Sequence, residues 1–300
     1  MIPNPSPDRY DELIARETRH WDATADHDPA NPQLWDDPRL FELALARPYR
    51  HLIERARASG GPVLELGCGD GQLACDLARA GLAVTGIDLS EERVMRARLR
   101  ARAAGLEHHA RFVSGDLNMV PMPRAAYTTV VAHDALHHIM ALDEVLDRAR
   151  SALIPGGRLI VSDFVGAGLL EKLACAAAIA VLPTRQSYRA KWRLRARARA
   201  LFASEQGKRA ALEHGGAELH DASPFEGISQ ESILPHVTAR FEVVEYFTFC
   251  PFWYHVLPKL RVPRAVREGI LATFRHIDEP LNRRGITRGS YCFIEARRPE

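Results

Sequence analysis

Between residues 60 and 165 the chain alternates between short apolar runs and stretches whose apolar residues recur at helical spacing. The runs are rich in valine, isoleucine and leucine and are bounded by glycine or acidic residues, a pattern typical of buried strands. The predicted strands are residues 63–66, 83–88, 111–116, 127–133 and 158–164, and the predicted helices are residues 72–80, 90–104 and 142–153. Strands that alternate with helices indicate an α/β fold with a doubly wound, mostly parallel sheet.

The pattern changes on both sides of this region. Amphipathic spacing predicts helices over residues 10–21 and 39–58, before the first strand. After residue 166 the alternation stops, and only two late strands return, at 241–247 and 291–296, with a helix near 264–276 between them. The chain therefore divides into an N-terminal helical cap (1–59), a cofactor-binding core (60–165), a helical lid or insertion (166–235) and C-terminal strands and helix that complete the sheet (236–300).

Composition narrows the class of protein. The chain has 300 residues, a formal net charge of +2 and five scattered cysteines without a C-x-x-C pair, so neither a disulfide framework nor a zinc ribbon is expected. The first residues lack the basic and apolar regions of a signal peptide. No stretch reaches the roughly 18 apolar residues of a membrane-spanning helix. We expect a cytoplasmic protein.

The stretch from Val63 to Gly71 carries the strongest chemical signal. A buried strand containing Glu65 is followed by glycines at 67, 69 and 71 and then by a helix. Glycine lets a ligand approach the backbone, and the helix start offers unpaired N–H groups. A dinucleotide fingerprint would place its third glycine one position later and no acid beside the turn. A cofactor with an ammonium group and no phosphate tolerates Glu65, and S-adenosylmethionine fits that description.

Further motifs follow at the spacing of successive strand–helix units. Val63 to Gly71 is followed by residues 86–90 (GIDLS), 115–117 (GDL), 131–138 (VAHDALHH) and 153–159 (LIPGGRL). In this order they resemble the motifs of the class I S-adenosylmethionine-dependent methyltransferases. The resemblance is close over about residues 60–165. It implies a Rossmann-like sheet of seven strands, with the two late strands forming the terminal hairpin.

The resemblance also implies roles for individual residues. The cofactor contacts it implies are Glu65, Gly67, Cys68, Gly69, Asp88, Leu89, Asp116, Leu117 and His133. Asp88 would accept hydrogen bonds from the two ribose hydroxyls, a task that suits a carboxylate because it only accepts. Asp116 would accept from the adenine amino group. The alternative for both acids is a structural role at a turn or helix start.

The histidines after the fourth predicted strand allow several interpretations. His137 and His138 are candidate general bases, because imidazole titrates near neutrality. They could instead only shape the pocket. A metal site is not expected, because the sequence shows no partner cluster of ligands elsewhere. Since the sulfonium is already activated, orientation of the reactants supplies much of the rate, and a base is not obligatory.

Residues 185–209 carry nine basic residues and a single acid, Glu205. This segment suits a solvated helical lid, recruitment of an anionic or lipid-linked acceptor, or peripheral contact with an anionic membrane. A nucleic-acid partner is disfavoured, because few aromatic residues accompany the charges. We expect Tyr188, Phe225 and Glu226 to face the acceptor.

The sequence thus predicts methyl transfer from S-adenosylmethionine to a small molecule by in-line displacement. Two alternatives stay open at this point. The chain could use the same cofactor for other chemistry, such as cyclisation or transfer of the aminocarboxypropyl arm, or it could be a non-catalytic scaffold that binds the cofactor. The acceptor atom and the oligomeric state are not specified by any motif.

Overall fold

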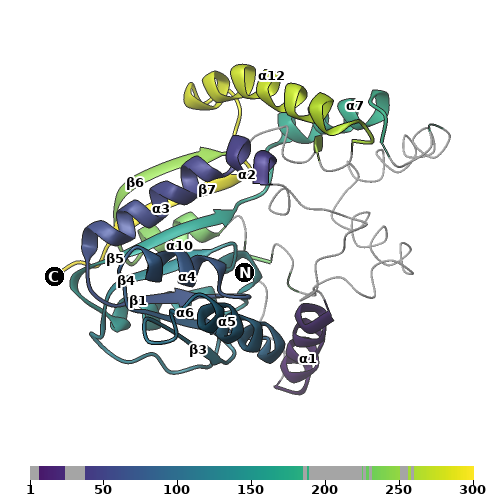
Figure 1. Cartoon of the computed structure of the whole chain (residues 1–300). Coiled ribbons are helices and arrows are strands. Elements are labelled where there is room, and N and C mark those ends of the chain that lie inside the picture. The colour runs from purple at the N-terminus through teal and green to yellow at the C-terminus, as the bar shows by residue number, and fades with distance from the viewer. Residues whose placement is uncertain are drawn as a thin grey trace.

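A computed structural model describes residues 7–23, 38–184, 188, 225, 228–229, 232–250, 256–257 and 260–300. A seven-stranded sheet in the order β3-β2-β1-β4-β5-β7-β6 forms its centre (Figure 1). The strands are β1 (Val63–Leu66), β2 (Val84–Asp88), β3 (Ala110–Ser114), β4 (Tyr127–His133), β5 (Leu153–Phe164), β6 (Glu242–Phe249) and β7 (Tyr291–Arg297). Strands β1 to β5 run parallel, whereas β7 is antiparallel to both of its neighbours. The predicted fold class is confirmed.

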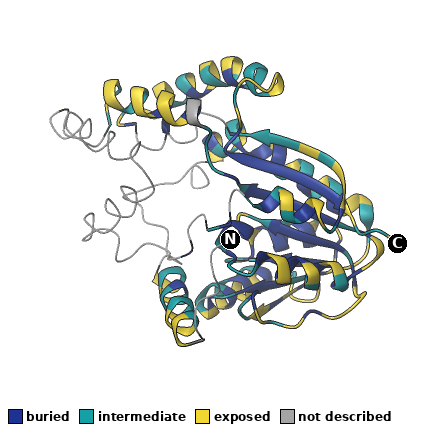
Figure 2. Ribbon diagram, turned by 180° about the vertical axis from the view of Figure 1, so that it is seen from behind, coloured by how far each residue is buried: buried dark blue, intermediate teal, exposed yellow. Residues whose placement is uncertain are grey.

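Helices cover both faces of this sheet. On one face lie α3 (Ala46–Ser59), α4 (Gln72–Arg79) and α5 (Glu91–Ala103); on the other lie α6 (Leu142–Ala152) and α10 (Ile233–Thr238). The strands between them are mostly buried, and exposed residues lie on the outer helix surfaces (Figure 2). This layering explains the continuous apolar runs in the sequence, because a parallel sheet is buried on both faces.

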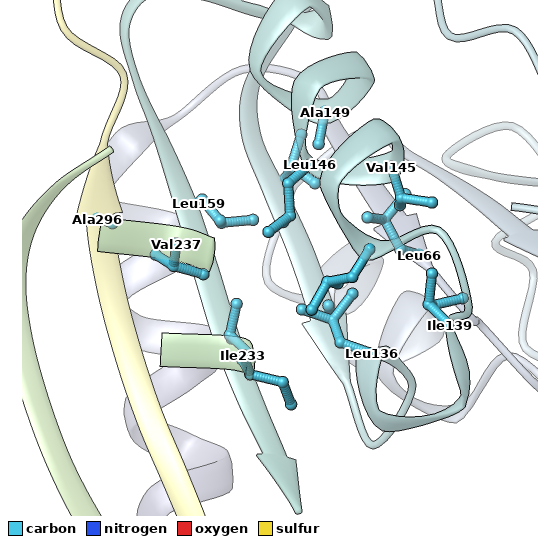
Figure 3. Packing of buried hydrophobic residues seen from close by; sticks show 14 of the residues in the cluster. Leu66, Leu136, Ile139, Val145, Leu146, Ala149, Leu159, Ile233, Val237 and Ala296 are labelled. Atoms are coloured by element: carbon cyan, nitrogen blue, oxygen red, sulfur yellow. The ribbon is translucent and has the colours of Figure 1, made fainter. Parts of the chain in front are cut away.

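One apolar cluster anchors α6 and α10 to the sheet. Leu146 of α6 and Leu159 of β5 are fully buried, and Ile233 and Val237 of α10 pack beside them (Figure 3). Truncating such a leucine to alanine typically costs about 2–5 kcal/mol of stability. The cluster therefore holds the loop after β4, which includes Leu136, in a fixed place.

The remaining described elements are α1 (Pro7–Ala23), α2 (Pro38–Ala44), α7 (Leu169–Val181), α12 (Arg264–Arg283) and the short 3₁₀ turn η2 (Leu136–His138). Helix α7 packs on α12 through Cys175, Leu260 and Ile270. Among the described helices, none combines the length and the apolar composition that crossing a bilayer requires. The basic segment 185–209, apart from Tyr188, lies outside the described residues, and so does Glu226.

Several element bounds differ from the sequence prediction. The helix expected over 39–58 is two helices, α2 and α3, separated at Leu45. Strand β5 begins at Leu153 rather than 158, because Leu153 pairs with Tyr127 before an irregularity in the register. Helix α12 continues to Arg283 although it contains Pro280. These bounds depend on strand pairing and tertiary packing, so the local spacing of apolar residues could not predict them.

Candidate active site

A cleft of about 630 Å³, part of it open to solvent, lies at the carboxyl ends of β1 to β4. In open α/β sheets ligands bind at this edge. The residues that line the cleft are Ile14, Glu17, Trp21, Gly67, Gly69, Asp88, Leu89, Arg93, Asp116, Leu117, Asn118, Asp134, Ala135, His138, Ile139 and Phe225.

The glycine turn after β1 forms the floor of this cleft. Gly67, Gly69 and Gly71 have φ values of 71°, 51° and 77°, a left-handed conformation that favours glycine. The amides of Gly67 and Cys68 donate to the carbonyl of Ile87 at 2.8 and 3.0 Å. A Cβ on Gly67 would lie 2.5 Å from Cβ of Ala135. At Gly69 a Cβ would be in ordinary van der Waals contact with Nη1 of Arg93, at 3.7 Å, and Gly69 lines the cleft.

Asp88 links the end of β2 to that turn. One carboxylate oxygen accepts from the Gly69 amide at 2.7 Å, and the other accepts from the Ser90 amide at 3.0 Å. Burial raises the pKa of Asp88, although these two amides and the nearby Arg93 guanidinium act in the opposite direction. The carboxylate therefore fixes the glycine turn while its edge remains part of the cleft wall.

Asp116 follows β3 and stands at the far end of the cleft. Its Oδ1 accepts from the backbone amide and the side-chain amide of Asn118, both at 2.8 Å. Its Oδ2 accepts a hydrogen bond from the phenol of Tyr10 on α1. Burial, followed by the bond to Asp116, raises the pKa of Tyr10, so the phenol remains a donor at neutral pH. A helix from the start of the chain thus reaches a predicted cofactor contact.

Helix α1 closes one side of the cleft (Figure 1). The indole of Trp21 packs on the Arg93 guanidinium, 4.3 Å from ring centroid to Cζ, and its ring centroid lies 5.0 Å from that of His138. The Trp21 Nε1–H donates to Oε1 of Glu17 at 2.7 Å. Asp22 accepts a hydrogen bond from the Ser90 hydroxyl. These contacts attach α1 to the loops that follow β2 and β4.

The two adjacent histidines have different surroundings. His137 is buried behind the cleft, and its Nδ1 lies 2.5 Å from Oδ1 of Asp163. His138 lines the cleft, and its Nδ1 lies 3.4 Å from Oε1 of Glu17. Burial, with the nearby His137 as the next cause, lowers the pKa of His138 to about 3. His138 is therefore neutral at physiological pH and carries a lone pair on one ring nitrogen.

Asp134, His137 and Asp163 bring possible metal-ligand atoms within 4.8 Å of one another. The Asp163 carboxylate, however, already accepts from the amides of Ala135 at 3.1 Å and Leu136 at 2.7 Å, as well as from His137. Its Oδ2 accepts hydrogen bonds from the backbone of the loop after β4. We assign this cluster to the support of that loop and propose no metal there.

The structure brings most of the predicted site residues together. Those that line the cleft are Gly67, Gly69, Asp88, Leu89, Asp116, Leu117, His138 and Phe225. Glu65, Cys68 and His137 are buried outside the lining, and His133 also lies outside it. Tyr188 is 53 % exposed and donates to the Val181 carbonyl, so its described position is away from the cleft.

The lining also includes residues outside the predicted site, namely Ile14, Glu17, Arg93, Asn118, Asp134, Ala135 and Ile139, together with Trp21, whose helix was expected only as part of an N-terminal cap. Asn118 and Ala135 adjoin predicted motifs, so proximity could have suggested them. Arg93 lies three residues after Ser90, which caps α5, and the first turn of that helix faces the cleft. Nothing in the spacing of α1 indicates where the helix docks.

Known proteins resemble this core. Residues 64–161 match the family described as "Methyltransferase domain". The 27-O-demethylrifamycin SV methyltransferase of Amycolatopsis mediterranei is 34 % identical over 137 residues, which cover 44 % of this chain and 49 % of that protein. Methyltransferase GfsG of Streptomyces halstedii is 35 % identical over 147 residues, 47 % of this chain and 53 % of that one. The chain thus spans about half the length of these relatives.

A solved structure extends the similarity in fold to nearly the whole chain. The geranyl diphosphate C-methyltransferase of Streptomyces coelicolor A3(2) superposes with a TM-score of 0.56 at 14 % identity, over 98 % of this chain and all of that one. The sheet order is that of a Rossmann-like fold, and the family match makes residues 64–161 a methyltransferase domain. Within that class, the core of the chain, residues 64–161, belongs to the class I S-adenosylmethionine-dependent methyltransferases.

Proposed function

We propose that the protein transfers the methyl group of S-adenosylmethionine to a small-molecule acceptor. The observation that carries the proposal is the cleft, where the glycine turn and the carboxylates of Asp88 and Asp116 meet in a chain segment that matches the methyltransferase domain. S-adenosylmethionine supplies a methyl group already activated by its sulfonium. Holding the acceptor in line with that group supplies much of the rate.

The residues present fit this cofactor. Gly69 lines the cleft and has no Cβ, so the methionine part could approach its backbone closely. Among the described residues, Glu65 Oε2 is a buried oxygen without a hydrogen-bond partner, directly behind the turn. Burial, then the charge of Asp88, raises the pKa of Glu65, and a cationic ligand nearby would offset that effect. A pyrophosphate would instead be repelled by these acids.

Each part of the cofactor has a matching group in the cleft. Asp88 would accept from the ribose hydroxyls, and Leu89 would pack on the adenine. Asp116 would accept from the adenine amino group, beside the Leu117 amide. Gly67 and Gly69 would contact the methionine part, with Cys68 and His133 in support behind them.

For the transfer step, His138 is the better placed of the two histidine candidates. It lines the cleft, where a ring nitrogen could take a proton from an acceptor hydroxyl or amine. His137 would support the reaction indirectly, since its imidazole and the Asp163 carboxylate hold the loop that carries His138.

For the acceptor side, Phe225 lines the cleft and would contact the acceptor, with Glu226 next to it in sequence. The basic segment 185–209 would recruit an anionic or lipid-linked acceptor, or a membrane surface that presents one. Tyr188 at its start remains a weaker candidate. We propose a small molecule rather than a nucleic acid, as the sequence lacks a nucleic-acid module.

Two measurements test this function. Isothermal titration with S-adenosylmethionine and with S-adenosylhomocysteine should give binding of one molecule per chain. Incubation with methyl-labelled cofactor and a bacterial metabolite extract should then yield a labelled product and S-adenosylhomocysteine by mass spectrometry. Absence of binding by the folded protein would refute the assignment. Release of 5′-methylthioadenosine instead would identify the alternative chemistry, either cyclisation or transfer of the aminocarboxypropyl arm.

A further inference from the structure

Two histidine–carboxylate pairs stand side by side at the cleft. His137 and His138 have ring centroids 4.1 Å apart, and each presents Nδ1 to an acid: Asp163 for His137 and Glu17 for His138. Asp163 comes from the end of β5 in the central sheet, whereas Glu17 comes from α1. The second pair is therefore assembled only when α1 lies over the cleft.

Glu17 is an unusual residue for the surface of a helix. It is 2 % exposed, while Arg9 and Glu12 on the same helix have half-exposed side chains. Its Oε1 accepts from the Trp21 indole at 2.7 Å and faces His138 Nδ1 at 3.4 Å. A buried acid is retained where its oxygens meet donors. Trp21 thus keeps an acceptor oxygen directed at His138.

The geometry has a consequence for the state of the imidazole. Neutral histidine carries its proton on one of two nitrogens, and the hydrogen bond at one nitrogen decides the state of the other. A nitrogen that faces a carboxylate oxygen is favoured as the N–H donor. In His138 this is Nδ1, which leaves the lone pair on Nε2.

We infer that Glu17 is a positioning residue, which holds His138 in the Nδ1–H form so that Nε2 can accept the proton of the methyl acceptor. The inference rests on the proposed function. In the step it serves, the acceptor's O–H or N–H proton moves to Nε2, the acceptor's lone pair bonds to the methyl carbon, and the carbon–sulfur bond breaks with its electron pair on sulfur. Docking of α1 therefore places Glu17 against His138 and completes the pair that would act as the base.

The test reads the tautomer directly and needs no acceptor. Long-range ¹H–¹⁵N spectra of protein labelled at its histidines distinguish Nδ1–H from Nε2–H, and His138→Gln assigns the signal. We expect His138 to be Nδ1–H in the full chain. Glu17→Met, which keeps side-chain length and helix propensity but removes the acceptor, should shift it toward Nε2–H. Glu17→Gln should retain Nδ1–H, because the Trp21 indole keeps the amide oxygen in place.

The matched control is Glu12→Met, which removes an exposed acid of the same helix and should leave the His138 signal unchanged. Backbone amide signals of α1 report whether the helix stays docked. If Glu17→Met undocks α1, the double variant Glu17→Gln/Trp21→Phe replaces it. Without the indole donor the introduced side-chain amide is free to rotate, so the preference of His138 for the Nδ1–H form should fall. An Nε2–H state in the full chain, or no response in these variants, would overturn the inference.

Failure of the inference is separable from failure of the proposed function. Cofactor titration of the same samples should show S-adenosylmethionine binding whether or not the tautomer responds to Glu17. If the protein shows the expected tautomers but binds no cofactor, the pairing of Glu17 with His138 would stand and the methyltransferase assignment would be refuted. A chain that binds cofactor with an unchanged tautomer would retain the assignment, and Glu17 would have only a packing role.

Discussion

The phenol of Tyr10, near the start of α1, donates a hydrogen bond to Oδ2 of Asp116, at the end of β3. In the proposed function Asp116 would also accept from the adenine amino group, so the cofactor and α1 would meet at one carboxylate. Its other oxygen is occupied by the two donors of Asn118. The first turn of α1 is therefore tied to the position that the adenine has to reach.

We predict that Tyr10→Phe accelerates cofactor association. The change removes one hydrogen bond, with a net value of about 0.5–1.5 kcal/mol, and shifts α1 toward an undocked state. The association rate constant for S-adenosylmethionine, measured by stopped-flow fluorescence, should rise, while urea unfolding should change by no more than that amount. An unchanged rate constant would mean that α1 does not restrict entry.

Replacing Asp88 should weaken the cofactor complex strongly. Asp88→Ala would remove both proposed ribose contacts, and it leaves the Gly69 and Ser90 amides without their acceptor. We expect a loss of about 2–4 kcal/mol in binding free energy, which is on the order of 30- to 1,000-fold in Kd. Isothermal titration measures it. Asp143→Ala is the control, because Asp143 pairs with His236 outside the cleft lining and should leave Kd nearly unchanged.

A pair of glycine variants separates ligand contact from backbone strain. Gly69 and Gly105 both have positive φ, 51° and 67°, and a Cβ at Gly105 meets nothing within 4 Å. Gly69→Ala and Gly105→Ala should each lower stability by about 1–2 kcal/mol, because alanine is strained there. Only Gly69→Ala should also weaken S-adenosylmethionine binding, since its Cβ enters the cleft. Equal affinity in both variants would place the cofactor elsewhere.

Acid should destabilise the protein through His138. The folded state lowers its pKa to about 3, whereas the unfolded chain takes up a proton near pH 6.5. The contribution of neutral His138 to the free energy of unfolding is therefore fully present above pH 6.5, and it is lost as the pH falls toward 3. Between pH 7 and 5.5 this amounts to about 1 kcal/mol. In urea unfolding, His138→Gln should lose less stability over that interval than wild type, while the exposed His108→Gln should behave like wild type.

The core of the fold was predictable because its signals are local. The run from Val63 to Leu66 is apolar because the sheet is buried on both faces, and Gly67 and Gly71 are glycines because a Cβ would meet Ala135 or Ala97. The acids at strand ends converge because parallel strands end at one edge. Each of these constraints fixes the residue types within one short motif, even where the neighbour in space is far along the chain. The motifs therefore reveal this part of the fold.

The other side of the cleft was not predictable in this way. Glu17 and Trp21 lie on a helix whose amphipathic pattern shows that one face is buried but not against what. The partners Arg93 and His138 are more than seventy residues away, and no motif joins them to α1. The interpretation of residues 185–209 as a lid stays a prediction, because the segment lies outside the described residues apart from Tyr188. The cytoplasmic location also stays a prediction.

Strand β7, the last in sequence, lies between β5 and β6 in the sheet. Because β6 pairs only with β7 among the described strands, residues 242–249 have no strand partner until Arg297 has been synthesised. A nascent chain that lacks this strand exposes the edges of both β5 and β6, and unpaired edges promote aggregation. Contacts between β5 and β7 also span more than a hundred residues, which slows folding. The sheet can therefore be completed only after residues 291–297 have been added to the chain, and a chain arrested before residue 291 would leave the edges of β5 and β6 unpaired.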